Sequence, residues 1–467
     1  MAVDSKNGLY QENIDRWQMM NDVCDGARAV KKATTKYLPY NFDCDSSTES
    51  NDRYCAFLSR AVFYPVTKDT LNNNVGLAFS EDPEFEPDGM DFLKNNADGA
   101  GTSIYQLNQK ALGLLLKHGR GGFFVDYPKT ENGATRADVE QRGIRPTVSL
   151  YDATQIINWR VTKYGGVFKT SLIVLFEKSL QADPQDEFTD KEVKTYRVLR
   201  LDDNQKYNVQ VYTDATGEMV AGEVFYPKRN GSDWDFIPFI PIGSQVNDFS
   251  IDEIPLEALA EINLAHYRNS ASYEQAVHIC GEVQPVLTEL SEEWRDKLIE
   301  QGIKLGSFDP LLLPAGGKFE FVSASIDMLA ADAMKDKMEY MGSLGAKVTD
   351  TSISAKTATQ VDSEDVKAYS VLSLCVANLN EAAEYYLKWC AEYHGSGFDA
   401  KFAIKQDFAV GEISLDELKF YQSEVVAGRM SKQTLHQIIS TGKKPEISYE
   451  DEQKRIEEDQ NGARLPV

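Results

Sequence analysis

The chain has 467 residues, of which 42% are hydrophobic and 10% aromatic, so it can form substantial cores and is not disordered overall. This length exceeds the size at which a single core usually stops growing, and two or more domains are therefore expected. With 49 basic against 73 acidic residues the formal net charge is −24, the opposite of a protein that grips nucleic acid through its phosphates.

Two further classes are excluded by simple patterns. No apolar run approaches the roughly 18 residues of a membrane span, and the first residues lack the basic and apolar regions of a secretory signal. We therefore expect synthesis in a cytosol and no membrane partner. The six cysteines form no C-x-x-C pair, which indicates reduced, mostly buried thiols.

The first quarter of the chain has helical periodicity. Gly and Pro interrupt it, and a polar stretch at 41–52 and an acidic stretch at 81–98 indicate loops. The predicted helices are Tyr10–Ala33, Arg53–Leu77 with a break at Pro65, and Gly101–Lys117, which ends on His118-Gly-Arg-Gly-Gly122. The last motif lacks the phosphate-loop spacing and precedes a strand, so we interpret it as a tight turn.

From Phe123 the apolar period changes from that of a helix to that of a strand. Segments rich in β-branched and aromatic residues alternate with Gly, Asp and Asn turns, which predicts an antiparallel sheet. The predicted strands are Phe123–Pro128, Thr147–Tyr151, Ile156–Val161, Phe168–Phe176, Val193–Leu201, Tyr207–Tyr212 and Trp234–Gly243.

A long helix is predicted to follow the sheet. Ser250-Ile-Asp-Glu253 matches a capping box, Pro255 suits a first helical turn, and helical composition continues to about Gly281. Polar residues interrupt its apolar stripe, which indicates a helix shared between several neighbours. They are Asn263, His266, Asn269 and Ser270.

An insert at 283–322 is expected to contain a short helix, Glu292–Gly302, and strands near Leu311 and Phe319. Next come a helical run from Ile326, a hydroxyl-rich segment at 348–358 and a second helix with an apolar stripe from Val366 to Tyr393. The polar segment is either a plain hairpin turn or a loop held out into a cavity. A strand, Phe402–Phe408, and a small helical region, Ser414–Ile456, complete the chain.

Motifs for chemistry are sparse in this sequence. The five histidines include no H-E-x-x-H pattern, no G-x-S-x-G elbow is present, and the carboxylate clusters are most simply solvated faces. The sequence thus predicts no catalytic residues, no metal, no cofactor and no enzyme activity.

Local runs spread over more than four hundred residues resemble the portal (head–tail connector) proteins of tailed bacteriophages. In chain order they are Trp17 with Asp25-Gly26, Tyr54–Phe63, Asp98–Ser103, Gly119–Pro128, Tyr151–Arg160, Phe239–Gly243, Ile254–Glu257, Asn263–Arg268, Thr357-Ala-Thr359 and Gly428–Thr434. Each run consists of ordinary residues, and their order carries the resemblance.

The resemblance implies an α+β fold of portal type. Its expected parts are a helical and β-rich wing (1–249), a stem helix (250–282), a small α/β clip (283–324) and a second stem helix (325–347). A tunnel loop (348–358), a long helix with a wing return strand (359–410) and a short helical crown with its tail (411–467) would follow.

It also implies a role and partners. The chain would form a ring, usually of twelve copies, at one capsid vertex of the virion, assembled in the host bacterial cytoplasm, with double-stranded DNA passing non-specifically through it during packaging and ejection. The terminase large subunit, head–tail adaptor proteins and major capsid and scaffolding proteins would bind to the ring.

Candidate sites follow from the same resemblance. The tunnel loop would present Lys347, Val348, Thr349, Asp350, Thr351, Ser352, Ile353, Ser354 and Lys356 to DNA. The stem would add Lys335 and Lys337 to the channel. The clip would offer Glu292, Glu293, Arg295, Lys297 and Lys304 to partners. For any single lysine, an ordinary solvated helix position is the simpler interpretation.

Two alternative classes remain open on the sequence alone. One is another ring or adaptor component of the phage head, although adaptors are usually small. The other is a nucleic-acid-processing enzyme, which would need a P-loop or a clustered carboxylate site, and neither pattern is visible.

Overall fold

The computed structural model describes residues 3–40, 48–128, 144–183, 186–214, 219–229, 231–281, 284–289, 291–301, 313, 316–322, 328–344, 358–394, 399–405, 415–441 and 447–462. The fold is mixed α+β, about half helical with several small antiparallel sheets, as the sequence predicts. The chain divides into two compact units, Met1–Ile404 and Lys405–Val467. No helix in the described ranges is long and apolar enough to cross a bilayer.

The N-terminal region is helical and more finely divided than predicted. Its elements are α1 (Gly8–Asp25), α2 (Ala27–Lys32), η1 (Thr34–Lys36), α3 (Thr48–Arg60) and α4 (Val66–Ala78). The single helix predicted over Tyr10–Ala33 is wrong, because Gly26 adopts φ 95° and its N–H caps α1 on the Asp22 carbonyl. The predicted break at Pro65 is confirmed, since residues 61–65 lie between α3 and α4.

A short strand and turn lead to α5. These are β1 (Glu84–Glu86), η2 (Asp91–Lys94) and α5 (Ile104–His118). A capping box of Ser103 and Gln106 begins α5, and Gly119, at φ 71°, ends it. A Cβ on Gly119 would lie 2.8 Å from the carbonyl oxygen of Glu253, so this tight turn requires glycine.

Two antiparallel sheets replace the single sheet that was predicted. One has the order β11-β2-β3, built from β2 (Arg120–Asp126), β3 (Thr147–Asp152) and β11 (Phe239–Gly243). The other has the order β4-β5-β6-β7-β8, built from β4 (Ile156–Tyr164), β5 (Val167–Asp183), β6 (Asp186–Leu201), β7 (Tyr207–Asp214) and β8 (Met219–Ala221). The last predicted strand is too long, because only Phe239–Gly243 pairs. A small hairpin, β9 (Lys228–Arg229) with β10 (Ser232–Asp233), precedes it.

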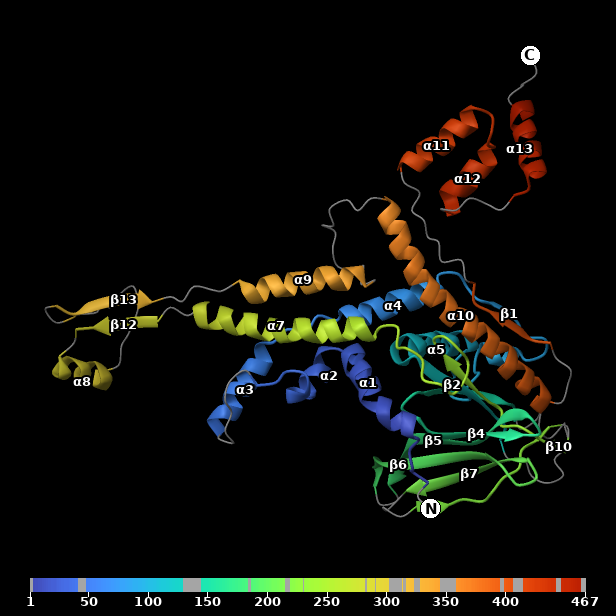
Figure 1. Cartoon of the computed structure of the whole chain (residues 1–467), viewed down its shortest axis with the longest axis horizontal. Helices are drawn as coiled ribbons and strands as arrows, with labels where there is room; N and C mark the ends of the chain where they lie inside the picture. The colour runs from blue at the N-terminus through green and yellow to red at the C-terminus, as the bar shows by residue number, and fades with distance from the viewer. Residues whose placement is uncertain are drawn as a thin grey trace. The chain divides into compact units, whose positions relative to one another are not determined.

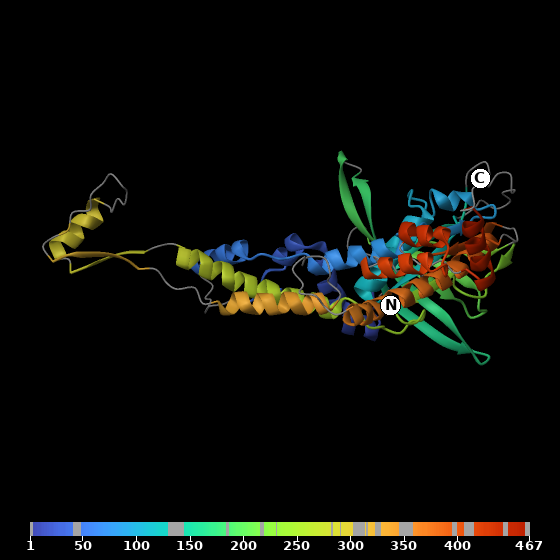
Figure 2. The same ribbon diagram turned by 90° about the horizontal axis from the view of Figure 1, so that it is seen from above.

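A second group of elements follows the sheets. It comprises α7 (Glu257–Gly281), β12 (Gln284–Thr288), α8 (Glu292–Gln301), β13 (Lys318–Val322), α9 (Leu329–Ser343), α10 (Ala358–His394) and β14 (Lys401–Ala403). Figures 1 and 2 show α7 and α9 side by side and antiparallel, with the paired strands β12 and β13 beyond their far ends. Strand β14 pairs with β1.

The main core lies between α10, α5 and the three-stranded sheet. The predicted apolar stripe of α10 is confirmed from Leu372 onward, where its members are buried. At the centre, Tyr386 packs 5.0 Å from Phe123 and accepts a hydrogen bond from Asn108 Nδ2 at 2.9 Å. Thus the stripe of α10 from Leu372 onward is covered within a single chain.

The second unit is a small helical group. It contains α11 (Leu415–Val426), α12 (Lys432–Thr441) and α13 (Tyr449–Gly462). Ser431 caps α12, and the carboxylate of Glu452 on α13 accepts hydrogen bonds from Ser431 N–H and the Thr434 hydroxyl at 2.7 and 2.6 Å. These bonds join α12 to α13, on which Ile438 and Ile456, respectively, are buried.

Candidate functional site

The candidate site is the helix pair α7–α9 with the insert that joins the two helices. Its first half is anchored to the N-terminal helices. Arg16 of α1 forms a two-pronged ion pair with Glu257 at the start of α7, with Nε to Oε1 at 2.6 Å. Farther along, Arg60 Nη1 donates to Gln275 Oε1 at 2.9 Å. These bonds fix where the helix leaves the core.

The extended segment 61–65 runs along α7 as a strap. It has helices on both sides and no strand partner, so its backbone groups need other hydrogen bonds. Ser270 Oγ accepts from Val62 N–H at 2.8 Å and donates to the Val62 carbonyl at 2.7 Å. Asn263 donates to the Tyr64 carbonyl at 3.0 Å and accepts from Thr67 N–H at 3.3 Å. Two polar side chains of α7 thereby provide hydrogen-bond partners for the backbone of the strap.

This arrangement explains why the apolar stripe of α7 is irregular. Asn263 and Ser270 are seven residues apart, so they lie on one face of the helix, and both are buried. The sequence pattern marks these residues as interruptions of the stripe but does not reveal the segment that they bind. Their helical spacing was the available signal, because a buried polar row needs a polar neighbour.

His266 lies on the same face and is fully buried. Its ring packs 4.8 Å from Tyr64 of the strap, and neither ring nitrogen has a hydrogen-bond partner among the described residues. Burial, and then the positive charge of Lys337 on α9, lower the pKa of His266. The histidine is therefore neutral at physiological pH and acts as a packing residue.

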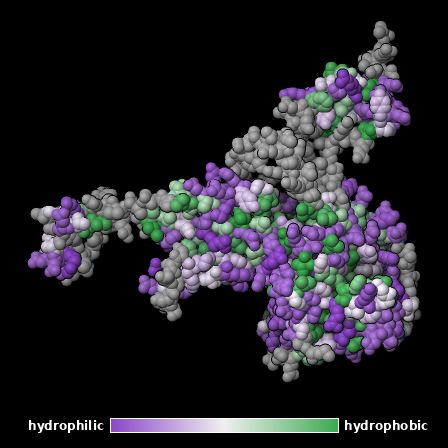
Figure 3. Space-filling model, in the orientation of Figure 1, coloured by the Kyte–Doolittle hydropathy of each residue, from purple (hydrophilic) through white to green (hydrophobic). Residues whose placement is uncertain are grey.

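The part of α7 beyond Ala271, together with α9, is much less covered by other side chains. Beyond Ala271 no described residue of α7 is buried, and on α9 only Met341 is buried among those described. Large apolar side chains stay open to solvent, and Leu329 is 71% exposed. The others are Ile279, Met328 and Tyr340. Figure 3 shows hydrophobic patches among polar ones along this pair.

The two predicted stem lysines lie on α9. Lys335 is exposed, whereas Lys337 is half-buried with its Nζ 3.4 Å from the Ala333 carbonyl. Three acidic residues lie close to these lysines on the same helix, namely Asp332, Asp336 and Glu339. The helix thus carries no continuous basic patch.

In the insert, the strand predicted near Phe319 is confirmed as β13, and it pairs with β12. The strand predicted near Leu311 stays a prediction, because Leu311 lies outside the described residues. The short helix is confirmed as α8, where Glu292, Glu293 and Arg295 are exposed. Arg295 pairs with the neighbouring Asp296 at 3.0 Å. The side chain of Lys297 and the whole of Lys304 lie outside the described residues.

The residues predicted for the tunnel loop lie outside the described residues. They are Lys347, Val348, Thr349, Asp350, Thr351, Ser352, Ile353, Ser354 and Lys356. The description resumes at Ala358, the first residue of α10.

The predicted capping box at Ser250 is wrong. Ser250 N–H donates to Asp248 Oδ1 at 2.7 Å, in a turn that ends well before α7 begins at Glu257. Asp252, two residues on, accepts from the N–H groups of Gln245 and Val246 at 2.7 and 3.0 Å. Local side-chain bonds therefore compact the loop 243–253 and do not start the helix.

Comparisons with known proteins give one family match. Residues 255–394 match a domain of unknown function, DUF4055. That span begins just before α7 and ends with α10, so it contains the whole helix pair and its insert. No curated protein matches the sequence significantly.

Among solved structures, chains of gene transfer agent particles are distantly similar to this one. The virion of a native gene transfer agent (GTA) particle contains a chain 12% identical, with a TM-score of 0.41, covering 89% of this chain and 99% of that one. The neck of the native GTA particle, computed with C12 symmetry, contains one 14% identical, also at 0.41, covering 83% and 93% respectively. A TM-score of 0.41 does not show a shared fold.

Proposed function

We propose that the chain is a portal subunit. Several copies, expected to be twelve, would form a ring at one capsid vertex, through which DNA is packaged and ejected and to which terminase and tail components attach. The order of resembling runs along the sequence supports this proposal, as does the order of elements. A long helix, an insert and a returning helix precede a further long helix, as the expected stem, clip and channel-crossing helix would.

The incomplete cover of the α7–α9 pair carries the proposal. Leu329, Met328, Ile279 and Tyr340 are more than half exposed in the single chain, which is costly for large apolar side chains grouped on one helix pair. In a ring, each pair has a neighbouring pair on both sides. Copies of the same helices would then cover these side chains, which suits a stem wall.

Charge supports passage of DNA with little adhesion. Each copy contributes a formal charge of −24, so a ring of copies would repel phosphates over most of its surface. Lys335 and Lys337 are the proposed stem contacts, and carboxylates at Asp332, Asp336 and Glu339 would keep such contacts weak. Weak, sequence-independent contact is what sliding DNA requires.

Mass photometry and negative-stain microscopy of the purified chain test the proposal. We expect particles whose mass is a multiple of 52.3 kDa, with a central hole. A chain that stays monomeric at micromolar concentration, or that assembles without a hole, contradicts the proposal.

A paired variant then tests the channel lysines. Lys335→Glu with Lys337→Glu should leave rings intact and reduce the amount of DNA packaged in the assembled particle. The matched control is Lys68→Glu, at an exposed lysine on α4. If both variants package equal amounts of DNA, the stem lysines do not contact DNA during packaging.

A further inference from the structure

An aromatic groove, which the portal role does not use, lies beside α10. It encloses about 730 Å³ between the end of the β4–β5 hairpin, β11 with its flanking residues, the loop 247–250 and α10. Such a volume is typical of ligand sites. Six aromatic side chains line it, namely Phe168, Phe236, Phe239, Phe249, Tyr385 and Trp389.

The groove is built from mutually packed rings. Phe249 stacks on Phe239 and on Trp159, with ring centroids 6.2 Å apart in both pairs. On the opposite wall, Trp389 packs 5.7 Å from Phe236 and 6.1 Å from Tyr385. Because five of the six lining rings pack on another ring, most of the groove is formed before any partner arrives.

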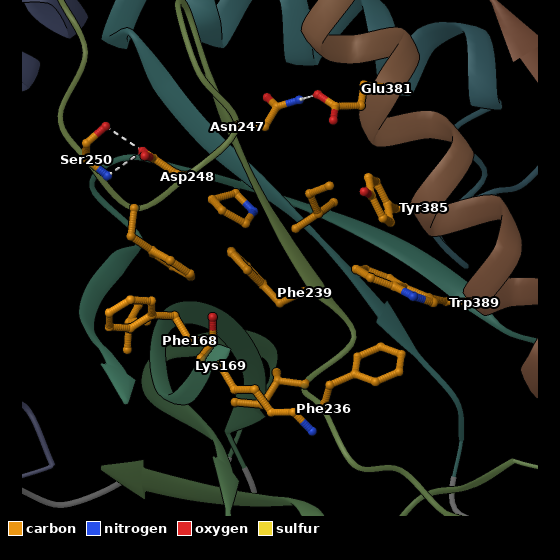
Figure 4. Close-up of a pocket in the computed structure, with 16 residues that line it drawn as sticks. Phe168, Lys169, Phe236, Phe239, Asn247, Asp248, Ser250, Glu381, Tyr385 and Trp389 are labelled. Atoms are coloured by element: carbon orange, nitrogen blue, oxygen red, sulfur yellow. Dashed lines mark hydrogen bonds between the residues drawn. The ribbon is translucent and has the colours of Figure 1, made fainter. Parts of the chain in front are cut away.

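Its loop wall is fixed to α10. Asn247 Nδ2 donates to the Asn378 carbonyl at 2.9 Å and to Glu381 Oε2 at 2.8 Å. Asn378 Nδ2 in turn donates to the Gly243 carbonyl at 2.8 Å. The carboxylates of Asp248 and Glu381 are thereby placed beside the aromatic floor, as Figure 4 shows.

The charge of this groove is negative. The basic residue that lines it, Lys169, is already paired, with its Nζ 3.1 Å from the Asp235 carbonyl and 3.3 Å from Asp235 Oδ2. Lys163, near the rim, stacks on the Phe168 ring at 5.5 Å. Among the described residues, the hydrogen-bond partners of Asp248 and Glu381 are the neutral Ser250 and Asn247. The buried guanidinium of Arg120 also acts electrostatically on Asp248 and offsets part of its charge.

The groove also leaves apolar surface open. Phe168 is 70% exposed and Tyr385 45% exposed, and Val161 on the same wall is exposed as well. Aromatic faces attract cations, and the adjacent carboxylates add to that attraction. Phosphates would be repelled, and a purely apolar guest would gain nothing from the carboxylates.

We propose that the groove binds an extended segment of another protein in which a Lys or Arg lies between apolar side chains. The cation would face Asp248 and Glu381, and the apolar neighbours would contact Phe168, Tyr385 and Trp389. Charge complementarity selects this occupant over nucleic acid. This binding is a function separate from the portal role. It can be measured on the chain whether or not rings form, so either proposal can fail without the other.

Fluorescence anisotropy with a labelled peptide tests this site. The probe is acetyl-Gly-Leu-Arg-Phe-Lys-Leu-Gly-amide, and its control carries Glu in place of Arg and Lys. We expect the basic peptide to bind about tenfold more tightly than the acidic one, with the preference decreasing at high salt. Equal binding of the two peptides, or no binding of the basic one, overturns the proposal.

Variants locate the binding. Asp248→Asn with Glu381→Gln keeps the acceptors for Ser250 and Asn247 and removes only the charges, so it should weaken binding of the basic peptide about tenfold. Phe168→Ser should weaken it as well, and Glu384→Gln, exposed on α10 and outside the groove, should not. Unchanged affinity for the basic peptide in the Asp248→Asn, Glu381→Gln variant overturns the proposal.

A different occupant would show itself in the oligomeric state. If Phe168→Ser dissociates copies of the chain, the occupant of the groove is a second copy and the proposed partner is wrong.

Discussion

Helix α10 and the α7–α9 pair differ in where their apolar side chains find cover. From Leu372 to Tyr393 the stripe of α10 is buried against α5 and the β11-β2-β3 sheet. In the α7–α9 pair, Leu329 and Tyr340 remain more than half exposed. The regular apolar stripe of α10 and the interrupted one of α7 therefore have different structural outcomes, because α10 has a sheet to pack on and the outer part of the α7–α9 pair does not.

The contrast also divides α7 itself. Its first half is held by the strap and by Arg16, and its second half contacts α9 and, through the Arg60–Gln275 bond, α3. We expect folding of one chain to depend on α10 and the anchored half of α7; under the portal proposal, neighbouring copies would cover the outer half. Substitutions in the two regions should therefore affect different measurements.

The largest effect on stability is expected at Tyr386. Tyr386→Ala removes a fully buried ring and leaves Asn108 without its hydroxyl partner, so the free energy of unfolding should fall by about 3–5 kcal/mol. Urea denaturation followed by circular dichroism measures this. Tyr385→Ala, one residue away and 45% exposed, should change it by less than about 0.5 kcal/mol. Equal losses would mean that α10 is not the core helix.

A pH-dependent effect of intermediate size is expected at His118. Its Nε2–H donates to Asn21 Oδ1 at 2.9 Å, and burial lowers its pKa from 6.5 to about 4. Below pH 6.5 the unfolded histidine binds a proton that the folded one does not, so this contribution to stability is lost as pH falls toward 4.

The matched variant is His118→Gln. Between pH 7.5 and pH 5 the wild type should lose roughly 2 kcal/mol more of its unfolding free energy than this variant, at about 1.36 kcal/mol per pKa unit. Denaturation at the two pH values gives the comparison. Parallel losses in both proteins would show that His118 is protonated in the fold.

Asn263 should have a slightly smaller effect, confined to the anchored half of α7. Asn263→Ala leaves the Tyr64 carbonyl and the Thr67 N–H without their side-chain partner, at a cost of about 1–3 kcal/mol. Hydrogen exchange should rise in residues 61–67 before it rises in α10. Asn269→Ala, at a half-exposed position on the same helix, is the control and should leave that exchange unchanged.

Sequence periodicity predicted what depends on local pattern. The stripe of α10, the turn at Gly119 and most strands follow from apolar spacing and turn residues, and all are present. Division of the strands into two sheets was not predictable in this way, because β11 joins β2 from more than a hundred residues away. The residues next to each strand in the sequence do not indicate this pairing.

The candidate site was predictable only in outline. The helix–insert–helix order followed from composition, whereas the strap on Asn263 and Ser270 needed knowledge of a segment two hundred residues distant. The capping box at Ser250 failed because a nearby Asp competes for the same donors. The aromatic groove gave no local signal, since its rings come from four separate stretches.

The smallest effect on single-chain stability, and the most direct test of the contrast, is expected at Leu329. Leu329→Ser removes a side chain that is 71% exposed, so the unfolding free energy of the monomeric chain should change by less than about 0.5 kcal/mol. Under the portal proposal, the fraction of ring particles in mass photometry should fall, because neighbouring copies would cover this position. The matched substitution Leu372→Ser, at a side chain only 2% exposed on α10, should instead reduce folded yield and stability. If Leu329→Ser destabilises the monomer as strongly as Leu372→Ser, α9 is already covered within one chain. If it changes neither stability nor assembly, the exposed face of α9 is not a contact between copies.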